Sequence, residues 1–319
     1  MSVAAVRIRR GHGADGSWET ALAVPHVRLR PGVISYRGMR LDLVRARARL
    51  EAPIGAATLL LGFEGSVRIS RAGHPTATLG SVFCGPTTTA ALGEHSGRLA
   101  GVEVLLMPWA AFTLFGTAQH ELADRVVDPD ELPHTLGSRW AGLGELAAAL
   151  AALPTWVARF GLLDDVLTRW SAAGTPSSER VVRAWSELVR TRGAVPVPRL
   201  ADEVGWSVRQ LENRFREQIG LGPKAAARVL RLQRARRLLA SGRSQAETAA
   251  VCGFYDQAHL SGEFRAMTGC TPGQFMGARV SPAAARSGMP AGDRMTGEAT
   301  SLLITPGHSA DFSKTGRAR

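Results

Sequence analysis

The spacing of apolar residues changes near Pro108 and divides the chain into two parts. From about Pro31 to Pro108, short apolar runs show rough alternation with polar positions, and Gly or Pro separates the runs. Many such runs at close spacing predict a small β-barrel or sandwich. After Pro108, apolar residues recur at helical spacing, as at Phe160, Leu163 and Leu167, which predicts helices as far as residue 276.

These patterns predict an α+β multidomain chain with four segments. A β-rich domain covers residues 1–135, although residues 1–30 are ambiguous, and connecting helices follow over 136–192. An all-α domain covers 193–280. Pro, Gly, Ala and Ser dominate after Ser281, so a disordered tail is expected over 281–319. Towards the end of the first segment, after Pro108, short helices are expected over Trp109–Gly116 and Gln119–Val127.

Two stretches of the predicted helical domain repeat one another. The motif Ala201-x-x-x-Gly205-Trp206 recurs as Ala249-x-x-x-Gly253-Phe254. The residues that follow recur 49 positions later in the sequence, Leu211, Phe215, Arg216, Gly220 and Pro223 as Leu260, Phe264, Arg265, Gly269 and Pro272. An internal repeat indicates a supersecondary unit used more than once. Here the unit is a helix, a tight glycine turn and a second helix, the geometry that places a helix in a DNA major groove.

The first copy carries local signals for both helices. Gly205 permits the left-handed backbone of a tight turn, and Ser207 with Gln210 forms a capping box that begins the second helix. Leu211 and Phe215 lie one turn apart and are expected in the core. The same spacing turns four polar side chains outward: Arg209, Glu212, Asn213 and Arg216. Among these, an Arg can bind guanine and an Asn can bind adenine through paired hydrogen bonds.

The second copy has the same organisation. A helix over Gln245–Cys252 precedes the turn, and Asp256 is the expected N-cap of a helix that ends at Met267. Leu260 and Phe264 form the inward pair. The outward side chains are Gln257, His259 and Ser261.

A helix over Lys224–Ala240 is expected between the copies. Its apolar stripe contains Val229, Leu232, Ala235 and Leu239, whereas Arg234 and Arg237 project elsewhere and are candidate phosphate ligands. A helix of about 16 residues is roughly 25 Å long, and one DNA turn is about 34 Å. One chain could therefore enter two successive segments of the major groove.

The charge distribution agrees with a polyanionic partner. The formal net charge is +12, and residues 196–285 carry 13 basic and 7 acidic side chains. The three cysteines, Cys84, Cys252 and Cys270, lack CxxC spacing, which favours a reducing cytosol over a disulfide framework. The N-terminus has no apolar signal core, and no apolar run approaches membrane-spanning length, so a cytoplasmic protein without a membrane partner is expected.

An enzyme with an accessory DNA-binding domain is the alternative from another class. Its β-rich half would be a metal-dependent barrel or a thiol-based DNA-repair domain. His74, Cys84 and His95 lie in that half, but no His-x-His spacing accompanies them, and no phosphate loop or nucleophile elbow occurs. We therefore expect no cofactor, no metal site and no catalytic residue. A third alternative is an interaction module whose barrel binds another protein.

Residues 196–276 resemble the DNA-binding domain of the AraC/XylS family of bacterial transcriptional regulators. The motifs that carry the resemblance are Leu200-Ala201-x-x-x-Gly205, Gly220-x-x-Pro223-Lys224 and Cys252-Gly253-Phe254-x-Asp256-Gln257-x-His259-Leu260-Ser261. The resemblance implies two helix-turn-helix units joined by one helix. The β-rich half, residues 1–135, is loosely similar to the cupin-like sensor domains of that family, which implies a role in effector binding, dimerisation or both.

The resemblance also implies partners and contacts. It implies a cytoplasmic transcription factor with sequence-specific DNA-binding activity, an activator or a repressor according to where its site lies. Double-stranded DNA is the expected partner, with RNA polymerase, a small-molecule effector and a second copy of the chain as further candidates. Gly262 stands where the family commonly carries Arg, so the second unit is expected to read DNA weakly or chiefly through the DNA backbone. The predicted DNA-binding residues are Arg209, Glu212, Asn213, Arg216, Arg234, Arg237, Gln257, Ala258, His259, Ser261 and Arg265.

Overall fold

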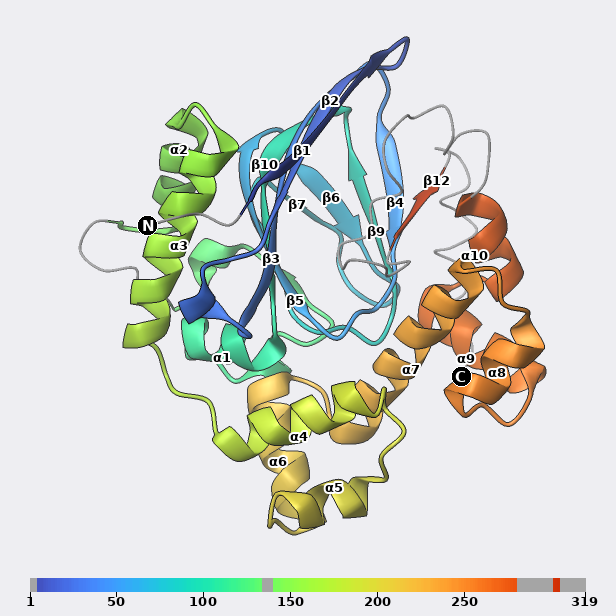
Figure 1. The fold of residues 1–319 in the computed structure, drawn as a ribbon. Coiled ribbons are helices and arrows are strands. Elements are labelled where there is room, and N and C mark those ends of the chain that lie inside the picture. The colour runs from blue at the N-terminus through green and yellow to red at the C-terminus, as the bar shows by residue number, and fades with distance from the viewer. Residues whose placement is uncertain (1–4, 134–139, 280–300, 305–319) are drawn as a thin grey trace.

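A computed structural model describes residues 5–133, 140–279 and 301–304 of the chain (Figure 1). Strands fill the first part of the sequence, and helices fill the part that follows. The fold is therefore the predicted combination of an antiparallel β-domain and a helical domain that contains the repeated units.

The strands form two antiparallel sheets. A seven-stranded sheet has the order β1-β2-β3-β10-β5-β8-β11, and a five-stranded sheet has the order β12-β4-β9-β6-β7. The strands have these bounds: β1 (Arg7–Gly13), β2 (Gly16–Ala23), β3 (Val33–Leu43), β4 (Arg47–Glu51), β5 (Ala57–Glu64), β6 (Val67–Ser70), β7 (Ala77–Leu79), β8 (Val82–Cys84), β9 (Ala91–His95), β10 (Arg98–Leu106), β11 (Val126–Val127) and β12 (Ser301–Ile304).

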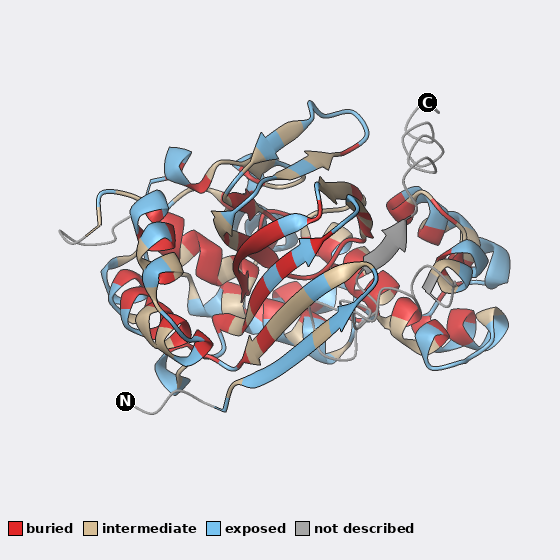
Figure 2. Ribbon diagram, turned by 90° about the horizontal axis from the view of Figure 1, so that it is seen from above, coloured by how far each residue is buried: buried red, intermediate tan, exposed pale blue. Residues whose placement is uncertain are grey.

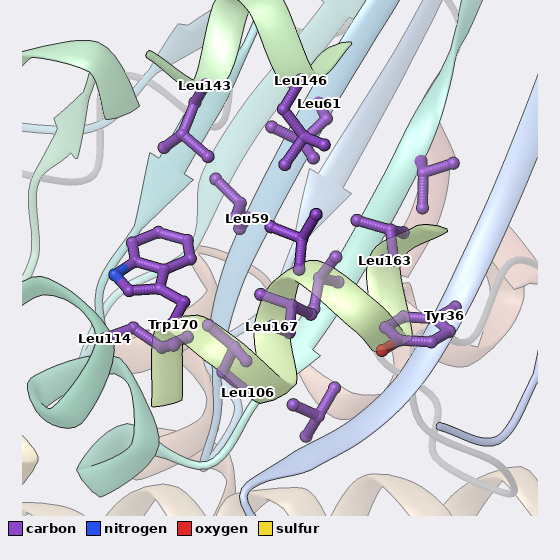
Figure 3. Close-up of a cluster of buried hydrophobic side chains, with 14 of the residues drawn as sticks. Tyr36, Leu59, Leu61, Leu106, Leu114, Leu143, Leu146, Leu163, Leu167 and Trp170 are labelled. Atoms are coloured by element: carbon purple, nitrogen blue, oxygen red, sulfur yellow. The ribbon is translucent and has the colours of Figure 1, made fainter. Parts of the chain in front are cut away.

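One face of the seven-stranded sheet packs against helices (Figure 3). The helices are α1 (Pro108–Phe115), α2 (Leu143–Ala152) and α3 (Trp156–Ala173). Alternate strand residues such as Leu59 and Leu61 contact Leu146 and Leu163 in one buried cluster, and Trp170 packs edge-on against Phe115 at 5.2 Å between ring centroids. The helices α2 and α3 pack against this sheet and form part of the core of the β-domain. The sequence analysis instead predicted them as helices that connect the two domains.

Two buried polar groups fix α3 in this core. The carboxylate of Asp164 accepts hydrogen bonds from the hydroxyl of Tyr36 and the backbone N–H of His26, both at 2.9 Å. The guanidinium of Arg159 donates to the carbonyl oxygens of Leu150 and Leu153 at 2.9 and 2.6 Å. These carbonyls lie at the C-terminal end of α2, where a cation satisfies otherwise unpaired oxygens.

The remaining helices form a second core. Val181, Trp185 and Leu188 of α4 pack with Leu211 and Phe215 of the first repeat unit, so α4 belongs with the C-terminal helices although the sequence predicted it as a connector. The bounds are α4 (Glu179–Arg190), α5 (Val197–Glu203), α6 (Val208–Ile219), α7 (Pro223–Ala240), α8 (Gln245–Cys252), α9 (Gln257–Thr268) and α10 (Pro272–Arg279).

Three local expectations differ from the structure. Residues 7–23, which the sequence left ambiguous, form the β1–β2 hairpin, whose first strand is an exposed sheet edge (Figure 2). The expected helix over Gln119–Val127 is wrong, because Gln119–Glu121 form only a 3-10 turn and Val126–Val127 pair with β8. These two β-branched residues pair with a strand that is distant in the sequence and do not form a local helix.

Most of the tail over 281–319, for which the sequence predicted disorder, lies outside the described residues. The exception is Ser301–Ile304, which pair with β4 as the edge strand β12, so a strand stands there in place of the expected disorder. No helix in the described part of the chain is both long and apolar enough to cross a membrane.

In the described part of the chain, backbone and side-chain hydrogen bonds join the two halves. The backbone N–H of Gly55 donates to Oε1 of Gln233 at 3.0 Å, and Nη2 of Arg236 donates to the carbonyl of Pro53 at 2.7 Å. The N–H of Ala90 donates to the carbonyl of Met267 at 2.8 Å. The β-domain thus contacts the helix between the repeat units and the end of α9.

Candidate nucleic-acid interface

The first repeat unit is a helix-turn-helix made by α5 and α6. Gly205 has a φ of 67°, and the N–H of the next residue, Trp206, donates to the carbonyl of Ala201 at 3.0 Å. This is the left-handed turn that the sequence predicts. Ser207 and Gln210 form the predicted capping box at the start of α6, so the direction in which α6 leaves the turn is fixed by backbone hydrogen bonds.

The two faces of α6 differ in exposure as the repeat predicts. Leu211 and Phe215 are fully buried, whereas Arg209, Glu212, Asn213 and Arg216 are exposed. Within the part of the chain that the structure describes, the side chains of Arg209 and Asn213 make no ion pair or hydrogen bond. Their donors are therefore available to an external partner, and both lie in the first half of α6.

The second repeat unit is a helix-turn-helix made by α8 and α9. Gly253 has a φ of 72°, and the N–H of Phe254 donates to the carbonyl of Ala249 at 3.0 Å, the same turn as in the first unit. Asp256 caps α9 by accepting from the N–H of His259 at 2.7 Å. Ser244 and Glu247 form a capping box at the start of α8, which the Ser-x-x-Glu spacing could have revealed.

The outward face of α9 carries less charge than that of α6. Gln257, Ala258 and His259 are exposed, as is Arg265 near the end of the helix. The Nδ1 atom of His259 accepts the N–H of Tyr255 at 3.1 Å, so this imidazole also braces the turn.

Two further positions on α9 offer a partner less than the sequence suggests. Ser261 is half-buried, and its hydroxyl lies 3.5 Å from Oε1 of Gln245 on α8, so it is less accessible than the sequence suggests. Gly262 is exposed, and a Cβ added there would meet nothing within 4 Å. No packing constraint therefore requires glycine at this position.

The helix α7 connects both units. Its predicted apolar stripe is buried at Val229, Leu232, Ala235 and Leu239. Arg228 forms an ion pair with Glu263 of α9, with N–O distances of 2.8 and 3.1 Å, so α7 and the second recognition helix are held together. Both Arg234 and Arg237 are half-buried.

Arg236 of α7 was missed by the sequence analysis. It is fully buried and bonds to Pro53 of the β-domain. The available signal was its position, because Leu232, Arg236 and Leu239 share one face of the helix at a spacing of three to four residues. An Arg on an otherwise apolar stripe is expected to need a buried acceptor.

The residues considered for metal or thiol chemistry are not brought together as a metal cluster. His74 is exposed in a turn, whereas Cys84 and His95 are half-buried. Among the described residues, no group of three or more His, Cys, Asp or Glu side chains could hold a metal ion. Burial, with Arg49 and Arg47 nearby, lowers the pKa of His95 to about 4.

Comparisons with known proteins agree with this geometry in the helical half. A model described as a helix-turn-helix domain matches residues 200–278. No curated protein matches the chain significantly. A solved transcriptional regulator with an AraC-type DNA-binding domain from Chromobacterium violaceum is 30% identical; the match covers 32% of this chain and 94% of that one, with a TM-score of 0.31.

Two other solved structures are similar. The DNA-binding domain of AdpA in complex with a target DNA is 27% identical over 35% of this chain and 100% of that one, with a TM-score of 0.31. ToxT from Vibrio cholerae is 10% identical over 76% of this chain and 97% of that one, with a TM-score of 0.44.

Proposed function

This chain belongs, through residues 200–278, to the AraC-type helix-turn-helix family, and from this premise we propose how it recognises DNA as a transcriptional regulator. The helices α6 and α9 enter successive segments of one major groove, and α7 sets the distance between them. The observation that carries this proposal is the matched turn geometry of the two units. Each has a left-handed glycine and the same 3.0 Å hydrogen bond across the turn.

In the first unit, Arg209 and Asn213 are proposed to read base edges. Both are exposed, and neither has a partner within the described part of the chain. An Arg fork suits the O6 and N7 acceptors of guanine, and an Asn amide suits N6 and N7 of adenine. Glu212 would accept from a cytosine amino group, and Arg216, further along the exposed face, would bind phosphate.

In the second unit, Gln257, Ala258 and His259 lie at the start of α9 and are proposed to contact bases or the sugar-phosphate backbone. Ser261 and Arg265 would contribute backbone contacts. Because Ala258 is apolar and Gly262 has no side chain, this unit is proposed to position the protein more than it discriminates sequence. Arg234 and Arg237 on α7 would add phosphate contacts.

Further partners follow from the family resemblance. We propose that the β-domain binds a small effector, since it contains a cavity lined by both sheets. A homodimer and a contact with RNA polymerase are the other proposed associations, and a cytoplasmic location follows from a DNA target. Sedimentation at increasing protein concentration, with and without operator DNA, tests the dimer.

Selection from a pool of random duplexes with the purified full-length chain tests DNA recognition. We expect a selected site bound at least about 10³-fold more tightly than a scrambled duplex. The affinity is expected to fall with salt, with a log–log slope of about −0.9 per phosphate contact. Recovery of no enriched sequence, together with a flat salt dependence, would contradict the proposed recognition.

A further inference from the structure

The strand β1 is an open edge of the seven-stranded sheet. All seven of its residues pair with β2, and no strand of the described chain pairs with its other side. The strand is exposed almost throughout, contains no proline and pairs with β2 without a bulge, so several devices that commonly close a sheet edge are absent. The β1–β2 hairpin extends away from α5 and α6 (Figure 1), which leaves the first recognition helix free when a partner occupies this edge.

The backbone groups of every second residue of β1 point away from the sheet. On β3, the N–H of Leu43 donates to Gly97 beside β10 at 3.2 Å, and the N–H of Val44 donates to Asp15 in the β1–β2 turn at 3.1 Å. Because these directions alternate along antiparallel strands, the unbroken registers from β3 to β2 and from β2 to β1 fix the direction at each residue of β1. The residues whose N–H and C=O groups face the open edge are Ile8, Arg10 and His12.

Two unpaired cations lie between these positions. The side chains of Arg7 and Arg9 are exposed, and neither makes an ion pair or hydrogen bond within the described part of the chain. Arg10 points to the opposite face of the strand, where it is paired with Glu19 of β2. The strand contains no acidic residue. Its unbalanced positive charge is therefore concentrated on the face that carries Arg7 and Arg9.

An aromatic ring continues this face. Gly11 is the next residue on the side of Arg7 and Arg9, and its partner in the register is Trp18 of β2. The indole of Trp18 lies over Gly11, since a Cβ added to the glycine would come within 2.4 Å of the ring. Trp18 is only half-buried. A side chain placed opposite Gly11 by an added strand would therefore meet the indole.

We propose that β1 binds an extended acidic segment of another protein as an added antiparallel strand. The segment exchanges backbone hydrogen bonds with the three residues that face the open edge. At the positions between them, side chains of paired strands come closest, so acidic side chains pair with Arg7 and Arg9, and an apolar side chain packs on Trp18. Along the partner chain, the matching pattern is apolar, any residue, acidic, any residue, acidic.

The charge of the edge disfavours two other occupants. A second copy that pairs through β1 would place Arg10 opposite Arg10, or Arg9 opposite Arg9, in registers that join most of the strand, and like charges directly opposite are destabilising. The phosphates of a nucleic acid accept hydrogen bonds but do not donate them, so they leave the outward carbonyls of β1 unmatched. An acidic strand satisfies both the backbone and the side chains. This inference concerns the β-domain alone and goes beyond the proposed recognition of DNA.

Fluorescence anisotropy of a labelled peptide with the full-length protein tests the partner class. The probe Ser-Leu-Thr-Glu-Val-Glu-Ser places its Leu opposite Gly11 and its two Glu opposite Arg9 and Arg7. One control peptide has Lys in place of both Glu, and a second is N-methylated at Thr and Val, whose amides would donate to the carbonyls of Arg10 and Ile8. We expect the probe to bind saturably and at least about 10-fold more tightly than either control, because each control loses two pairing interactions. No binding of the probe, or equal binding of the probe and either control, would overturn the proposal.

Variants locate the site on β1. Ile8→Pro removes an outward N–H at a position where an edge strand tolerates proline, so the affinity for the probe is expected to fall about fivefold or more. Ile8→Thr keeps this N–H and is the matched control, which should bind within about twofold of the unmodified protein. Arg9→Gln should weaken binding about threefold and flatten its salt dependence, whereas Arg45→Gln, at an exposed position before β4, should change neither. If Ile8→Pro alters thermal unfolding, His12→Pro replaces it.

The same variants separate the other occupants. Unchanged affinity for the probe in a folded proline variant rejects the added strand. Displacement of the bound probe by a random duplex would assign the edge to nucleic acid, and a dimer of the unmodified protein that dissociates in Ile8→Pro would assign it to a second copy. Either result overturns the proposal, whereas failure of the protein to select a DNA site bears only on the proposed function.

Discussion

The two helix-turn-helix units share one turn geometry but differ in what surrounds it. Leu211 and Phe215 of the first unit belong to a large core that includes Trp185 of α4 and residues of β4. In the second unit, Phe264 belongs to the same large core, whereas Leu260 lies in a small separate cluster with residues of α7 and α8. The repeated motif therefore determines the turn, whereas the neighbouring helices determine how firmly each unit is held.

The outward faces of the two units differ as well. At the 49-residue offset of the repeat, Arg209 corresponds to Ala258 and Asn213 to Gly262. The side chains best suited to reading bases in the first unit are thus absent from the second. This difference supports the proposal that the first unit discriminates sequence and the second mainly positions the protein, and four pairs of substitutions test it.

The largest effect is expected on the free energy of unfolding, when the corresponding core leucine of each unit is replaced by alanine. Leu211→Ala should lower the free energy of unfolding by about 3–5 kcal/mol, and Leu260→Ala by about 2–3 kcal/mol, because the extensive core around Leu211 is less able to collapse into the space left. Both residues are fully buried. Chemical denaturation of each variant measures the effect, and an equal or larger loss for Leu260→Ala would contradict the stated difference in anchoring.

A smaller effect, on the free energy of DNA binding, is expected from replacing residues proposed to contact bases. Arg209→Ala should cost about 1–3 kcal/mol of binding free energy and relax base preference at one position. Gln257→Ala, at the start of α9, should leave base preference nearly unchanged. Binding assays on duplexes randomised at single positions compare the two, and unchanged selectivity in Arg209→Ala would remove this residue from base recognition.

A modest gain in stability is expected at Gly262. Replacing it with Ala should raise the free energy of unfolding by about 0.5–1 kcal/mol, since the position is exposed, helical and free of neighbours. The control is Gly253→Ala, where a φ of 72° makes a side chain unfavourable by about 1–2 kcal/mol. Thermal unfolding should therefore shift in opposite directions, and a loss of stability in Gly262→Ala would show an unrecognised constraint.

The smallest effect on DNA binding is expected from substitutions on α7. If Arg237 contacts phosphate, Arg237→Ala should weaken binding evenly across sequences and reduce the salt slope by about 1. Arg234→Ala should do the same. Titrations at several salt concentrations measure the slope, and a slope unchanged from that of the unmodified protein in both variants would place these arginines outside the interface.

The helical half could be predicted closely because its local signals agree with one another. Ser207, Gly205 and Leu211 each indicate the same turn and helix start, and α8 has the bounds that its pattern predicts. When capping, turn chemistry and apolar spacing coincide, tertiary contacts only reinforce them. The positions of the outward side chains then follow from helical geometry.

The β-domain was harder to predict because its decisive contacts are distant in sequence. The β1–β2 hairpin is polar and largely exposed, so it carries little apolar pattern, and Val126–Val127 become a strand only by pairing with Phe83 and Cys84. The burial of Arg71 and Arg236 was equally hidden. Charged residues are expected at the surface, and only the fold reveals which of them are enclosed.

The dependence of α7 on the β-domain has a practical consequence for dissecting the protein. A fragment that begins after α3 would leave Leu230, Trp185 and the Gln233 amide uncovered, since Gly55 lies against all three. It would also remove the Pro53 carbonyl that accepts from the buried Arg236. Apolar surface that becomes exposed in this way promotes self-association. The isolated helical half is therefore expected to aggregate more readily than the whole chain, and solubilising substitutions at Leu230 would be needed before its DNA binding is compared with that of the intact protein.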